Sequence, residues 1–123
     1  MSLDFNKLDV GASKKLIEPR KIFTTLKRNT LFRRPLDEQA DVLDAWYMRR
    51  DSKHLTIKMN TGGGKTVVGL LCLQSSLNEN IKPAVYVTPD NFLVSQVMSE
   101  ARKLGINVTD DTDSSDFLAG RAI

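Results

Sequence analysis

Apolar residues recur at helical spacing near the start of the chain. Pro19 suits the first turn of a short helix, in which Ile22, Phe23 and Leu26 would share one face. Residues 36–50 show a wider apolar stripe with the same period. Both segments are therefore expected to be helices that bury one side.

Two further helices are expected over residues 66–77 and 91–104. The first is apolar on nearly every side, which predicts a helix buried between layers. The second carries a single apolar stripe, with Asp90 before it as an N-cap and Gly105 after it as a stop signal.

Three short β-prone runs, residues 55–59, 84–88 and 106–109, separate these helical segments. The second run is apolar enough to be covered on both faces, as in a parallel sheet. The order of the predicted elements is strand, loop, helix, strand, helix, strand. This order is typical of α/β proteins, in which the chain winds right-handed into a parallel sheet. The pattern thus predicts an α/β fold with a parallel sheet, preceded by a helical N-terminal segment.

Length and composition restrict the class of protein. With 123 residues, the chain is expected to form one domain at most. No apolar run approaches the about 18 residues of a membrane span, and the N-terminus lacks the order of a secretory signal, so no membrane association and a cytoplasmic location are expected. The single Cys72, expected to be unreactive core, and the single His54, expected at the surface, exclude a disulfide scaffold and a zinc finger.

The charge is unevenly distributed along the chain. Residues 1–58 carry 13 basic and 8 acidic side chains, whereas the remainder carries 5 and 7. Residues 14–34 contain eight basic residues and one acid, Glu18. This stretch is expected to bind nucleic acid weakly and with strong salt dependence, and a solvated helix face remains an equal alternative.

A glycine-rich segment, TGGGKT, connects the first predicted strand to a predicted helix. Glycines allow successive backbone N–H groups to surround phosphate oxygens, and the helix adds its positive end. Lys65 would reach the β- and γ-phosphates of a nucleotide, and the hydroxyl of Thr66 would bind Mg²⁺. A glycine turn that only provides flexibility is the alternative, but it does not require Lys-Thr directly after it. The expected phosphate-binding residues are Thr61, Gly62, Gly63, Gly64, Lys65 and Thr66, of which Lys65 and Thr66 are also the expected catalytic residues.

The loop resembles the first motif of the DEAD/DEAH-type helicases of superfamily 2, A-x-T-G-x-G-K-T, and departs from it only at Met59. The segment PDNFLVSQ, residues 89–96, resembles motif Ia of that family, P-T-R-E-L-A-x-Q, with Asn91 in place of arginine. The resemblance covers residues 35–123. It implies a P-loop NTPase of the RecA-like three-layer type that binds ATP and Mg²⁺ and moves on DNA or RNA. The residues that it implies in nucleic-acid contact are Pro89, Asn91 and Gln96.

Gln39 lies 26 residues before Lys65 and resembles the glutamine that reads the adenine edge in this superfamily. A glutamine amide can pair with both N6 and N7 of adenine. The alternative is a surface glutamine in the first turn of a helix. Gln39→Ala is expected to relax base choice and to leave the triphosphate contacts unchanged.

The resemblance also shows what the chain lacks. The sequence lacks three features of the family: the acidic D-E-x-x motif, the Ser-Ala-Thr motif and a second RecA-like domain with an arginine finger. Asp110-Asp111 does not replace the acidic motif, because no Glu follows it. The chain is thus expected to be the N-terminal portion of a longer helicase, nearly inactive without the remaining helicase domains. Residues 1–34 would form a basic arm and helix, and residues 35–123 an incomplete ATP-binding domain.

Two other classes remain open. A non-hydrolytic nucleotide-binding module with a regulatory or interaction role would need the phosphate loop but not the missing motifs. A small-molecule or nucleotide kinase would also use the loop, but it has no use for the segment at residues 89–96.

Overall fold

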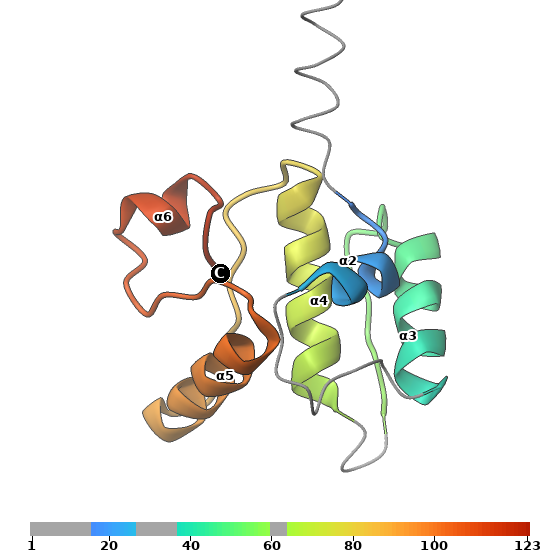
Figure 1. The fold of residues 1–123 in the computed structure, drawn as a ribbon, viewed down its shortest axis with the longest axis horizontal. Helices are drawn as coiled ribbons and strands as arrows, with labels where there is room; N and C mark the ends of the chain where they lie inside the picture. Colours follow the sequence, from blue (N-terminus) through green and yellow to red (C-terminus); the bar gives the residue numbers. More distant parts are fainter. Residues whose placement is uncertain (1–15, 27–36, 60–63) are drawn as a thin grey trace, which may run out of the picture.

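Helix α4 lies at the centre of the protein. The computed structural model describes residues 16–26, 37–59 and 64–123. Helices α2 and α3 pack on one side of α4 and on each other, and α5 packs on its other side (Figure 1). The helices in the described residues are α2 (Pro19–Thr25), α3 (Asp37–Met48), α4 (Lys65–Asn78), α5 (Asn91–Leu104) and α6 (Ser115–Leu118).

The burial of α4 explains its apolar sequence. Leu70 and Leu71 are completely buried, and Val68 and Cys72 are buried beside them. The predicted burial of this helix is therefore confirmed, although the neighbours that bury it are helices and not the expected layers of an α/β fold. Burial raises the pKa of the Cys72 thiol to about 12. The thiol is thus protonated at neutral pH, as expected for an unreactive core cysteine.

Helix α2 joins the same core through the apolar face that the sequence predicts. Ile22 and Phe23 are buried, and α2 contacts both α3 and α4. Two side chains of α4 hold the backbone just before α2: the Ser75 hydroxyl donates to the carbonyl of Ile17, and Asn78 Nδ2 donates to the carbonyl oxygen of Leu16 at 2.6 Å. Because these partners lie about 60 positions apart in the chain, the sequence pattern does not reveal them.

Helix α5 begins and ends at the predicted residues. The Asp90 carboxylate accepts a hydrogen bond from the backbone N–H of Leu93 at 2.9 Å, which is the geometry of an N-cap. Gly105 ends the helix with a φ of 84°, in the left-handed region that favours glycine. The short helix α6 was not predicted, because its polar sequence resembles a loop; the Ser114 hydroxyl caps it and Phe117 is buried.

The predicted α/β fold, with a parallel sheet in a three-layer arrangement, is wrong for the described residues, which form helices and no strand. None of the runs at residues 55–59, 84–88 and 106–109 is a strand. The backbones of the first two runs form no hydrogen bond with other backbone groups in the described ranges. Figure 1 shows these two runs on opposite sides of α4. A strand exists only when a neighbouring backbone lies about 4.8 Å away, and β-propensity alone does not supply that neighbour.

The third run has one short pairing with the end of the chain. The N–H of Thr109 donates to the carbonyl of Ile123 at 2.9 Å, and the N–H of Ile123 donates to the carbonyl of Asn107 at 3.0 Å. Ile123 is thus hydrogen-bonded to Asn107 and to Thr109, the two neighbours of the residue opposite it. This is the hydrogen-bond pattern of a parallel pair of segments. Two such bonds connect the segments without forming a sheet.

The run at residues 84–88 was expected to be covered on both faces, and this expectation is also wrong. Ala84 is buried, but Val85 is 54% exposed and Val87 is 80% exposed. Exposed apolar side chains beside unpaired backbone groups favour association with another chain.

Val87→Lys is expected to reduce concentration-dependent self-association, because lysine on an exposed extended segment opposes edge pairing. Sedimentation velocity over a range of protein concentrations measures this effect. Met48→Lys is the matched control, since Met48 is 82% exposed but lies on α3. If Val87→Lys, Met48→Lys and the chain without a substitution self-associate to the same extent, the prediction is contradicted.

Within the described ranges, no helix combines the length and apolar character that a membrane crossing requires.

Candidate functional site

The start of α4 carries the described part of the predicted phosphate loop. Gly64 has left-handed backbone angles, φ 75° and ψ 40°, and its carbonyl accepts the first helical hydrogen bond, from the N–H of Val68 at 3.1 Å. Lys65 is exposed and Thr66 is partly exposed. The N–H groups of a first helical turn have no acceptor within the helix and attract anions. The other predicted loop residues, Thr61, Gly62 and Gly63, lie outside the described residues.

Gln39 and Gly64 are in direct contact. Gln39 is 8% exposed, and its Nε2 donates to the carbonyl oxygen of Gly64 at 3.4 Å. A Cβ added at Gly64 would lie 1.6 Å from that nitrogen. Gln39 is thus not a surface glutamine, and position 64 requires glycine both for its φ and for the space that the amide occupies.

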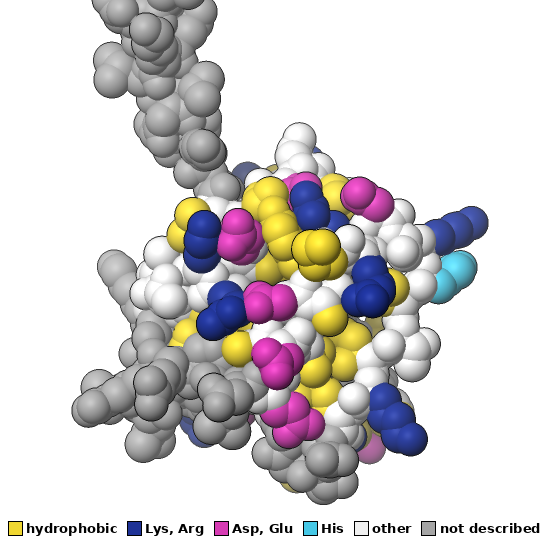
Figure 2. Space-filling model, turned by 90° about the vertical axis from the view of Figure 1, so that its right-hand side faces the viewer, with side chains coloured by type: hydrophobic (Ala, Val, Ile, Leu, Met, Phe, Trp, Pro, Cys, Tyr) yellow, Lys and Arg dark blue, Asp and Glu magenta, His cyan; other side chains and the backbone are white. Residues whose placement is uncertain are grey.

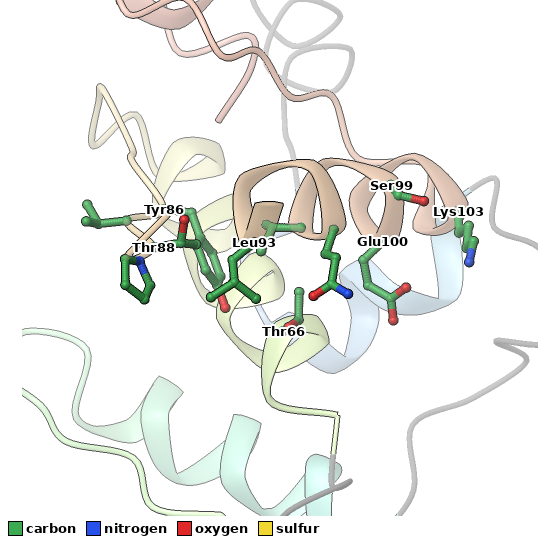
Figure 3. Close-up of a pocket in the computed structure, with 11 residues that line it drawn as sticks. Thr66, Tyr86, Thr88, Leu93, Ser99, Glu100 and Lys103 are labelled. Carbon is green, nitrogen blue, oxygen red and sulfur yellow. The ribbon is translucent and has the colours of Figure 1, made fainter. Parts of the chain in front are cut away.

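Thr66 also lines a cavity of about 580 Å³ between α4, α5 and the segment that connects them. Figure 3 shows Thr66 opposite Leu93 and Glu100 of α5. Pro89 and Gln96, which were expected to contact nucleic acid, line the same cavity. The third residue of that set, Asn91, is exposed at the first position of α5 and does not line it.

Two charged residues of this cavity were missed by the sequence reasoning. Glu100 and Lys103 line it together with Gln96. These residues are spaced i, i+4 and i+7 along α5, so they lie on one face of the helix. This spacing could have identified them from the sequence once Gln96 was selected.

The predicted basic stretch is only partly within the described residues. There Arg20 lies 2.9 Å from Asp44, and Lys21 lies 3.4 Å from Glu18, so both basic side chains are paired with acids. Figure 2 shows the face over α3, on which described acidic and basic side chains are mixed, with exposed His54 at the edge. The remaining basic residues lie outside the described residues: Lys14, Lys15, Lys27, Arg28, Arg33 and Arg34.

At the ends of α3 and α4 opposite to Gln39 and Gly64, the two helices are joined by an ion pair. Arg50 Nε lies 2.7 Å from Glu79 Oε1, and the guanidinium stacks 4.0 Å from the centroid of the Tyr47 ring. The hydrogen bond that Arg50 donates to the Glu79 carboxylate raises the pKa of Arg50 above its ordinary value, so Arg50 stays charged. This pair helps to hold α3, and therefore Gln39, against α4.

The start of α4 thus combines a left-handed glycine, an exposed lysine and a threonine, and the buried Gln39 contacts the glycine. The family model for DEAD/DEAH box helicases matches residues 36–119, which is more than half of the chain. The chain therefore belongs to the DEAD/DEAH box helicase family, a family of ATP-dependent helicases, and the match is consistent with the N-terminal part of a helicase RecA-like domain. No curated protein and no solved structure matches the chain.

Proposed function

We propose that the chain is the ATP-binding portion of an ATP-dependent nucleic-acid helicase or translocase, and that ATP with Mg²⁺ binds at the start of α4. The main support is the geometry of Gly64, whose left-handed backbone opens α4 directly before Lys65 and Thr66. This geometry lies within the residues that match the family. A helix start with an adjacent lysine suits the negative charge of a triphosphate.

The residues at this helix start have the chemistry that a magnesium nucleotide requires. Lys65 is an exposed cation at the first helical position, so it would contact the β- and γ-phosphates. The hydroxyl of Thr66 is a hard oxygen donor and would hold Mg²⁺, which neutralises phosphate charge when bound. Gln39 would contact adenine, and its position beside Gly64 supports a nucleotide near α3.

Hydrolysis would require the remaining helicase domains of a parent chain. Phosphoryl transfer is accelerated mainly by positioning and by charge stabilisation, so an acidic motif and an arginine finger would supply most of the rate. The residues of this chain would bind and orient the nucleotide. The chain alone is therefore expected to bind ATP but to hydrolyse it very slowly.

Isothermal titration of ATP with Mg²⁺ into the chain, followed by an assay for released phosphate, tests this proposal. Saturable binding with little turnover is the expected result. A chain that binds neither ATP nor ADP in the presence of Mg²⁺ would contradict the proposal.

The nucleic-acid partner would be DNA or RNA, contacted through Pro89, Asn91 and Gln96. The position of Pro89 and Gln96 on the cavity that Thr66 lines supports a connection between the nucleotide and the nucleic acid. Such a connection is what a motor requires, because hydrolysis at one site must change contacts at another.

Replacing Lys27, Arg28, Arg33 and Arg34 together by glutamine is expected to reduce the salt dependence of nucleic-acid binding. Each phosphate contact contributes about 0.7 to 0.9 to the log–log slope, so the four replacements remove up to about 3.6 units. Fluorescence anisotropy of a labelled oligonucleotide at several NaCl concentrations measures the slope. The control is Lys53→Gln, an exposed lysine outside the stretch. An unchanged slope would identify the stretch as a solvated face.

A further inference from the structure

Gln39 crosses from α3 to the start of α4 and contacts the backbone of Gly64 there. Its Nε2 donates to the carbonyl oxygen of Gly64 at 3.4 Å, and the same oxygen accepts from the N–H of Val68 at 3.1 Å. The two donors come from different helices, α3 and α4. The Gly64 carbonyl is thus held from outside α4 as well as from within it.

Holding this carbonyl also determines the direction of the next N–H group. The peptide unit between Gly64 and Lys65 is planar, and in a trans peptide the C=O and N–H bonds point in opposite directions. The Lys65 N–H belongs to the first helical turn, where N–H groups have no acceptor within the helix. Fixing the carbonyl on one side therefore directs the N–H away from the helix, toward the place where an anion would bind.

We propose that Gln39 is a positioning residue for the phosphate-binding backbone: its amide orients the peptide unit between Gly64 and Lys65 and so strengthens phosphate binding whether or not a base is present. This inference rests on the proposed nucleotide-binding function and goes beyond adenine reading. It also reverses one expectation from the sequence, namely that Gln39→Ala leaves the triphosphate contacts unchanged.

The burial of Gln39 supports this role. Its side chain occupies the space that any Cβ at position 64 would enter, 1.6 Å from Nε2. Buried amides are retained where their hydrogen bonds are satisfied, because an unsatisfied buried amide is costly. Gln39 and Gly64 thus depend on each other: glycine leaves room for the amide, and the amide holds the glycine carbonyl.

Inorganic tripolyphosphate with Mg²⁺ is the probe that separates positioning from base reading, because it has no adenine. Gln39→Ala is expected to weaken its binding by about 3- to 10-fold, the effect of one neutral hydrogen bond. Glu38→Ala is the matched control, since Glu38 is the exposed neighbour of Gln39 on α3, and it is expected to bind as the unchanged chain does. Isothermal titration measures all three proteins.

Gln39→Met separates the hydrogen bond from packing, because methionine has a similar length and volume but no N–H donor. The inference expects Gln39→Met to bind tripolyphosphate as weakly as Gln39→Ala. In the free protein, the backbone amide resonances of Lys65 and Val68 should shift in both variants and not in Glu38→Ala. Thermal unfolding confirms that each variant is folded.

Tripolyphosphate binding that is unchanged in Gln39→Ala, or restored in Gln39→Met, would overturn the inference and leave the proposed function intact. The same holds if the unchanged chain binds ATP but not tripolyphosphate. An unchanged chain that binds neither ligand would instead contradict the proposed function, and with it the inference.

Discussion

Replacing Lys65 by alanine is expected to lower the affinity for ATP with Mg²⁺ by at least about tenfold. A hydrogen bond between charged groups contributes about 1.5–3 kcal/mol, which corresponds to roughly 10- to 150-fold in affinity. Lys65 is exposed at the first position of α4, so its removal is not expected to disturb the core. Isothermal titration with ATP and Mg²⁺ measures the loss.

The control for this variant is Lys53→Ala, which removes an exposed lysine outside the described helices. It has the same effect on net charge but no expected contact with the nucleotide. If Lys65→Ala and Lys53→Ala bind ATP with the affinity of the unchanged chain, α4 does not begin a phosphate site.

Phe23→Ala is expected to lower the free energy of unfolding by about 3–5 kcal/mol, the usual cost of removing a fully buried aromatic ring. Phe23 is 1% exposed, and its helix α2 packs against both α3 and α4. The loss is large compared with the about 5–15 kcal/mol that stabilises a typical domain. Urea unfolding followed by circular dichroism measures it.

Phe92→Ala provides a matched comparison, because it deletes the same ring from a position on α5 that is 71% exposed. Its unfolding free energy is expected to change by less than about 0.5 kcal/mol. Similar losses in the two variants would show that α2 does not pack in the core in solution.

Helix positions were largely predictable because the signals for them are local. Asp90 and Gly105 lie at the two ends of α5 and act on backbone groups within a few residues of themselves. The apolar period of α2 likewise identified Ile22 and Phe23 as buried. Helix caps and apolar periodicity depend on residues three or four positions apart. Such short-range relations can be read directly from the sequence.

Strand formation was not predictable from the same sequence. Val85 and Val87 have high β-propensity, yet they lie on an exposed segment without a hydrogen-bonded neighbour in the described residues. Whether a run becomes a strand depends on another segment lying beside it. That segment is chosen by packing, here by the position of α4 between the two runs (Figure 1).

The candidate site likewise has one part that the sequence predicts and another that it does not. The order of Gly64, Lys65 and Thr66 at a helix start is readable from the sequence, because a glycine run followed by Lys-Thr is a local pattern. The sequence also selected Gln39, but only by resemblance and only as a contact for adenine.

The tertiary structure alone decided what Gln39 touches. Its amide meets Gly64 because α3 packs against α4, and these residues lie 25 positions apart in the chain. The meeting of Thr66 with Gln96 and Glu100 on one cavity likewise requires the packing of α4 against α5. Sequence by itself determined helices α2 to α5 and the chemistry at their ends, because the signals for both act over a few residues. Contacts between helices depend on how buried side chains fit together, which no local pattern encodes.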